Sequence, residues 1–147
     1  MSVMHVTQTP VRGALLKGKR AALVCGEETL TWSQFLDRIT RVAGVLRDVG
    51  VGPDVAVSML ADTCFEYFDY HFATPWAGGV LVPMNTRLSD AEMVHILNDA
   101  EVKVLICGPE YAHRLPALKA GAKYLQAVIG IGLPEEPLDY ETLWRAR

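Results

Sequence analysis

Four short apolar runs recur at nearly even intervals from residue 55 onward, and this spacing limits the folds open to the chain. The runs cover residues 55–60, 80–82, 102–107 and 127–131, so their starts are 25, 22 and 25 residues apart. A continuous apolar run of this length is typical of a strand covered on both faces, and each interval is long enough for one crossover helix. The spacing therefore predicts an α/β fold with a parallel, layered sheet and crossover helices.

The stretch 80–97 joins the second of these runs to the start of a helix. Pro83 ends the run, because proline has no N–H to donate to a sheet. Ser89 and Glu92 then match the S-x-x-E capping box that often begins a helix. The apolar residues that follow fall on one face of that helix: Met93, Val94 and Leu97.

Two further capping boxes predict two more helices. Thr31 with Gln34 begins an amphipathic helix that Gly50 ends, and Thr63 with Glu66 begins a second helix. The second helix is aromatic on nearly every side, which predicts that it lies between the sheet and another layer. Pro75 is expected to kink or end it. Glu66 and Asp69 are expected to form its solvated edge.

The two ends of the chain carry weaker patterns. We divide the chain into an N-terminal segment, residues 1–20, and an α/β subdomain, residues 21–147. The first segment is expected to be weakly ordered or to form a short helix with Val11, Leu15 and Leu16 along one side. Residues 21–24 and 29–32 favour a small β-hairpin ahead of the sheet. Gly108 and Pro109 are expected to start a helix whose Leu115 and Leu118 face inward. Pro116 is expected to make this helix irregular. Asp139 would cap a last helix over 140–147.

Composition narrows the function classes. The net charge of −3 gives no electrostatic reason to expect nucleic-acid binding. No apolar run reaches transmembrane length, and the first residues lack the pattern of a signal peptide. Cys25, Cys64 and Cys107 are odd in number and widely spaced, so we expect reduced, mostly buried thiols in a cytoplasmic protein.

Four segments in register resemble one enzyme family. They are GGVLVPMNTRL (78–88), LTWSQF (30–35), LRDVGVGP (46–53) and LNDA (97–100) followed by VLI (104–106). Together they resemble the N-terminal part of the AMP-binding, adenylate-forming enzymes, in particular the fatty-acyl and aryl CoA ligases. The resemblance covers about residues 21–131 and implies a partial acyl-CoA synthetase-like N-terminal subdomain, incomplete at its C-terminus.

This resemblance implies a chemistry for the full-length enzyme. Such ligases use ATP and Mg²⁺ to turn a small-molecule carboxylate into an acyl-adenylate, and then usually transfer the acyl group to CoA. The serines of this chain are Ser2, Ser33, Ser58 and Ser89, and none lies in a Gly-rich phosphate loop. We therefore assign no catalytic residue, and expect the chain alone to be inactive and to bind none of these cofactors tightly.

The resemblance to the family implies one candidate binding residue in this chain. Arg87 matches a basic residue that faces the CoA nucleotide in some CoA ligases, and a guanidinium suits phosphate. The alternative is a solvated arginine that only precedes a helix.

Several other residues could suggest a site. His71 and His95 have no second ligand at helical spacing, so we predict no metal site. Cys64 and His71 lie seven positions apart, too far for a nucleophile and its base. Asp62 follows a strand, as a phosphoacceptor would, but lacks an acidic pair.

Two alternatives to a ligase fragment remain open. One is a stand-alone, non-enzymatic α/β module that binds a partner or assembles with itself, and the other is a minimal nucleotide binder. A fragment of a larger domain is also expected to self-associate through exposed apolar surface.

Overall fold

A parallel five-stranded sheet forms the centre of the computed structural model, which describes residues 5–147. Its strands are ordered β4 (Val80–Pro83), β3 (Ala56–Leu60), β5 (Val104–Cys107), β6 (Ala127–Gly130) and β7 (Leu138–Asp139). Every neighbouring pair is parallel. A separate antiparallel hairpin, β1 (Ala21–Cys25) with β2 (Glu28–Thr31), precedes the sheet. The predicted fold class, hairpin included, is confirmed.

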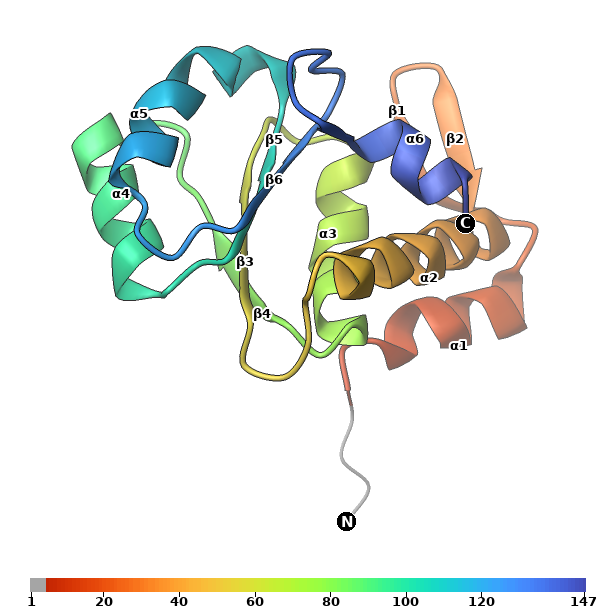
Figure 1. Ribbon diagram of the computed structural model, residues 1–147. Helices are drawn as coiled ribbons and strands as arrows, with labels where there is room; N and C mark the ends of the chain where they lie inside the picture. The colour runs from red at the N-terminus through yellow and green to blue at the C-terminus, as the bar shows by residue number, and fades with distance from the viewer. Residues whose placement is uncertain (1–4) are drawn as a thin grey trace.

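Helices cover both faces of the sheet (Figure 1). One side carries α2 (Trp32–Asp48), α3 (Phe65–Trp76) and α6 (Tyr140–Arg145), with α1 (Gln8–Lys17) packed outside α2. The other side carries α4 (Asp90–Asp99), the 3₁₀ helix η1 (Pro109–Arg114) and α5 (Leu115–Gly121). The helix expected after Gly108 is thus split into two pieces, in keeping with the predicted effect of Pro116. None of the helices in the described part of the chain is long and apolar enough to cross a bilayer.

The central strand β3 shows how these largely apolar runs are covered on both faces. Val57 and Met59 face the core under α2 and α3, whereas Ala56 and Leu60 face the core under α4 and α5. All five residues of the strand are buried. Alternate apolar side chains therefore enter two different cores. Ser58, the polar residue of the strand, is fully buried, and its hydroxyl has no hydrogen-bond partner among the described residues.

Two of the three predicted capping boxes are present. Thr31 Oγ1 accepts from the Gln34 amide at 3.2 Å, and Ser89 Oγ accepts from the Glu92 amide at 3.3 Å, each with the reciprocal bond. The third box, at Thr63, is wrong. Helix α3 is capped instead by Cys64, whose side chain makes no capping bond, so Glu66 sits one position too early to complete a box.

The structure corrects four smaller expectations. Trp32 belongs to helix α2 rather than the hairpin, because Thr31 already caps the helix. Cys25 is exposed near the tip of the hairpin, while Cys64 is half-buried and Cys107 buried. Asp139 caps the last helix as predicted, but that helix ends at Arg145. The two-residue strand β7 was not predicted.

The prediction that Asp69 lies on a solvated edge is wrong, because its side chain is fully buried. Arg38 of α2 donates to its carboxylate through Nη2 at 2.6 Å and Nε at 3.1 Å, and the Tyr140 hydroxyl of α6 donates at 3.0 Å. The Arg38 guanidinium also lies 4.6 Å from the Trp144 ring centroid. Burial raises the pKa of Asp69, while Arg38 and Tyr140 oppose that rise. One carboxylate therefore joins three helices.

Candidate functional site at the carboxyl edge of the sheet

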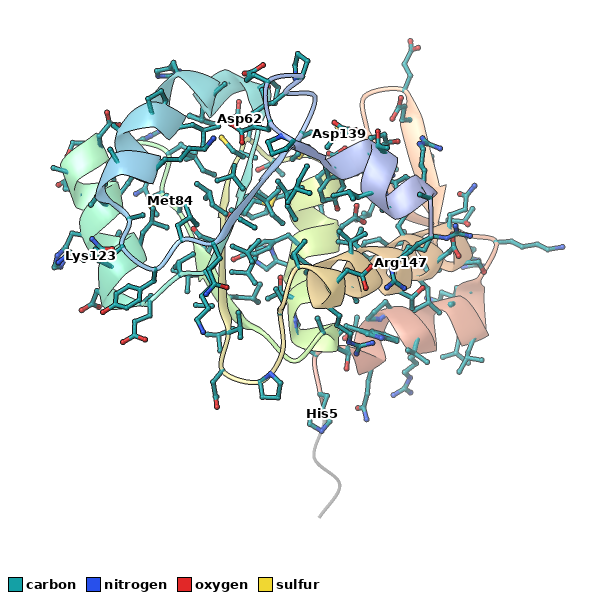
Figure 2. All side chains as sticks on the ribbon, in the orientation of Figure 1. His5, Asp62, Met84, Lys123, Asp139 and Arg147 are labelled. Atoms are coloured by element: carbon teal, nitrogen blue, oxygen red, sulfur yellow. The ribbon has the colours of Figure 1, made fainter. Side chains whose placement is uncertain are left out.

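The loops that follow β3, β4 and β5 meet at one edge of the sheet, because the strands are parallel. The chain passes from β3 to β4 on one side, then crosses back over β3 to reach β5. The β3–β5 boundary is therefore a topological switch point, where open α/β sheets commonly bind ligands. A cleft of about 240 Å³ lies there. It is lined by Ala61, Asp62, Thr63, Cys64, Glu66, Gly108, Pro109, Glu110 and Ile131. Figure 2 labels Asp62, one of the residues that line the cleft.

Carboxylates dominate this cleft. Asp62, Glu66 and Glu110 all line it. The Tyr111 hydroxyl of η1 donates to Asp62 Oδ1 at 2.6 Å, and this bond raises the pKa of Tyr111. Three acidic side chains repel a triphosphate, so the cleft alone does not fit ATP.

Gly108 shows a further difference from a phosphate loop. A Cβ at this position would lie 3.0 Å from both the Ala61 Cβ and a Glu110 carboxylate oxygen. The glycine thus allows close packing of protein on protein, rather than leaving backbone N–H groups free for an anion. The residues that line this cleft therefore lack the free backbone N–H groups of a phosphate loop. No cluster of His, Cys, Asp and Glu in residues 5–147 could hold a metal ion.

Cys64 lies in the cleft but does not have the properties of a nucleophile. Burial, and then the neighbouring Glu66 carboxylate, raise the pKa of Cys64 to about 12. His71 does not act as its base, because the His71 Nδ1 atom lies 3.1 Å from the Tyr67 carbonyl oxygen. The Cys64 side chain therefore remains a protonated thiol at neutral pH, where thiolate would be the reactive form.

The cysteines should consequently differ in reactivity. We expect iodoacetamide at pH 8 to modify Cys25 first, because it is exposed, and to leave Cys64 and Cys107 largely unmodified in the folded protein. Burial likewise raises the pKa of Cys107 to about 12. Peptide mass mapping after timed labelling would measure this order, with urea-unfolded protein as the control. Labelling of Cys64 as fast as Cys25 would contradict it.

The loop after β4, residues 84–89, carries Arg87 and is held in place by Arg114 of η1. The Arg114 guanidinium donates to Asp90 Oδ1 at 2.5 Å and to the Leu88 carbonyl oxygen at 2.6 Å. Asn85 Oδ1 accepts from the Arg87 amide at 3.0 Å, and Met84 anchors the start of the loop in the core. The loop is thus fixed on both sides of Arg87.

The Arg87 side chain itself is exposed and forms no ion pair with any residue in 5–147. An unpaired guanidinium on a fixed backbone can donate two hydrogen bonds to an anion. Sequence reasoning singled out Arg87 but missed Arg114, which lies more than twenty residues further along the chain. No local pattern links the two.

The chain belongs to the AMP-binding enzyme family, whose model matches residues 12–144.

Curated relatives agree with this membership. The chain is 38% identical over 112 residues to a feruloyl-CoA synthase of an Amycolatopsis species, covering 76% of this chain and 23% of the relative. It is 35% identical over 136 residues to the long-chain-fatty-acid–CoA ligase of Thermus thermophilus, covering 88% of this chain and 25% of the relative. The chain thus spans about a quarter of the length of these relatives.

Solved structures share the fold. A fatty acyl CoA synthetase of Mycobacterium tuberculosis matches with a TM-score of 0.81 and 26% identity, over 85% of this chain and 26% of that one. The anthranilate CoA ligase AuaEII, solved in complex with anthranoyl-AMP, matches with a TM-score of 0.92 over 98% of this chain and 28% of that one. Its identity of 21% supports the fold alone.

Proposed function

We propose that this chain is the N-terminal portion of an ATP-dependent, AMP-forming carboxylate–CoA ligase. The parent enzyme would join a carboxylic acid to ATP, releasing pyrophosphate and forming an acyl-adenylate, and would then transfer the acyl group to the thiol of CoA. The observation that carries this proposal is the family match across residues 12–144, together with relatives that are named as CoA ligases. The acid would be fatty or aromatic, the two classes named among those relatives.

Within such an enzyme this portion would act as a scaffold. Its sheet and helices present the loops at the carboxyl edge, and the remaining chain would supply the phosphate loop and adenine site. The acidic cleft and the close packing at Gly108 support placing the phosphate loop in the remaining chain, since neither feature suits a triphosphate. The isolated chain is therefore proposed to be inactive, and titration calorimetry with Mg²⁺–ATP is expected to give no heat of binding.

A chimera tests the proposal directly. Residues 12–144 would replace the matching segment of the Thermus thermophilus ligase, and pyrophosphate exchange and acyl-CoA formation would be measured separately. If the chain is a ligase scaffold, a folded chimera performs both half-reactions, whereas the isolated chain performs neither. A folded, monodisperse chimera without pyrophosphate exchange would contradict the proposal.

We propose that Arg87 contacts a phosphate of the CoA nucleotide. Replacing Arg87 by alanine in the chimera is then expected to raise KM for CoA about tenfold, the low end for one charge-assisted hydrogen bond at an exposed site. Pyrophosphate exchange should not change, because CoA takes no part in adenylation. Steady-state kinetics of the two half-reactions would separate these effects.

Two further variants control this experiment. Arg87→Lys keeps the charge but loses bidentate geometry, so an intermediate KM is expected. Lys123→Ala removes an exposed cation whose backbone amide donates to Asn98 at the C-terminal end of α4, whereas Arg87 precedes the N-terminal end, and it should leave KM unchanged. An equal rise in KM for Lys123→Ala would show that only net charge matters.

A further inference from the structure

The charges of this chain are divided unevenly along its length. Residues 1–26 contain four Lys or Arg and no Asp or Glu, whereas residues 27–147 contain ten Lys or Arg against seventeen Asp or Glu. The first segment thus carries a charge of +4 and the rest a charge of −7. Such asymmetry commonly marks a segment that contacts an anionic surface.

Helix α1 combines this charge with unusually exposed leucines. Leu15 is 80% exposed and Leu16 is 69% exposed, although both belong to a helix whose other side, around Pro10, packs on α2. Arg12 and Lys17 flank them and are also exposed. Figure 1 shows α1 as the outermost helix on its side of the molecule.

The cations of this helix are free to bind an external partner. Within residues 5–147, neither Arg12 nor Lys17 forms an ion pair, and the same holds for Lys19 and Arg20, which follow the helix. A groove of about 680 Å³ runs beside the leucines to the half-buried Trp76 at the end of α3. Tryptophan and leucine beside unpaired lysine and arginine form the side-chain set of a surface that enters a lipid headgroup layer.

We propose that the outward face of α1 docks on an anionic phospholipid surface. Leu15 and Leu16 would insert among the acyl chains just below the headgroups. Arg12 and Lys17 would pair with the lipid phosphates and carboxylates. We call these four residues the lipid face.

The composition of the lipid face favours a bilayer over other partners. A nucleic acid would attract the cations but leave two protruding leucines in water. A second copy of the chain would match the leucines but bring the same cations together, and like charges at an interface oppose association. A lipid surface satisfies both the apolar and the charged groups.

Vesicle co-sedimentation of the 147-residue chain tests this proposal. Phosphatidylcholine vesicles that contain phosphatidylserine should bind the chain, pure phosphatidylcholine should bind it much less, and added NaCl should weaken binding. The double variant Arg12→Gln/Lys17→Gln should lower partitioning about 25-fold, because each surface cation contributes about fivefold. The double variant Leu15→Ala/Leu16→Ala should lower it about tenfold or more.

Matched control variants distinguish vesicle binding through the lipid face from nonspecific vesicle binding. Val24→Ala removes a side chain that is 68% exposed on the hairpin, and Lys103→Gln/Lys123→Gln removes two cations elsewhere. Both should bind as the unaltered chain does. Every variant should keep the melting temperature, since the altered side chains of the lipid face make few contacts.

Four results would overturn the proposal. The first is no dependence on phosphatidylserine, and the second is unchanged binding of the lipid-face variants. The third is vesicle binding by the isolated chain that disappears in the active chimera, because the face would then be an internal contact of the larger enzyme. Concentration-dependent dimers in light scattering, abolished by Leu15→Ala/Leu16→Ala in the absence of vesicle binding, would likewise assign the face to a second copy.

Discussion

Replacing Asp69 by alanine is expected to lower the free energy of unfolding by about 3–5 kcal/mol, the usual result of removing one partner of a buried ion pair. The Arg38 side chain, only 11% exposed, would keep its charge without a carboxylate. The Tyr140 hydroxyl, also buried, would lose its acceptor. Urea unfolding followed by circular dichroism would measure the change.

An exposed ion pair on α2, the helix that carries Arg38, provides the control. Asp37 accepts from Arg41 at 2.8 Å one turn away, and its side chain is 54% exposed. Asp37→Ala should therefore cost no more than about 0.5 kcal/mol. Similar losses for the two alanine variants would contradict a stabilising role for the buried network.

The Tyr70→Phe variant is expected to lose about 1–3 kcal/mol, because it leaves buried backbone groups without a partner. The Tyr70 hydroxyl donates to the Val57 carbonyl oxygen at 2.8 Å and accepts from the Val82 amide at 3.0 Å. It thus ties helix α3 to β3 and to the edge strand β4 at once. Faster hydrogen exchange of the Val82 amide should accompany the loss.

Tyr67→Phe is the matched variant for this measurement. Tyr67 lies on the same helix, is half-buried, and its hydroxyl forms no hydrogen bond within the described residues. Its loss should be smaller than that of Tyr70→Phe, and exchange at Val82 should stay slow. If both variants lose the same stability, the hydroxyl bridge contributes nothing specific.

The features that could be predicted from sequence are those encoded by neighbouring residues. The apolar runs predicted the sheet, because both faces of each strand are covered. Ser89 with Glu92 predicted the start of α4, because a capping box lies within one helical turn. Thr63 failed as a cap because helix α3 begins one residue later, at Phe65, with Cys64 as its N-cap. The side chain of Cys64 makes no capping bond, so no local motif marks this start.

Asp69 and Arg114 show where local patterns carry no information. Asp69 is one of several polar residues on an aromatic helix, and its partner Arg38 lies 31 positions earlier in the chain. Arg114 holds the loop of Arg87 from a 3₁₀ helix 24 positions beyond its partner Asp90. Burial of the first and placement of the second depend on how helices pack, which periodicity does not encode.

The native mass of the protein tests the central claim most directly. Since 112 aligned residues are 23% of one relative and 136 are 25% of another, a complete relative is about three to four times as long as this chain. An immunoblot of source cells, with an antibody raised against residues 21–147, should therefore show a band about three to four times heavier than 16.2 kDa. A band at 16.2 kDa with no heavier species would contradict a ligase portion and would favour a stand-alone binding module.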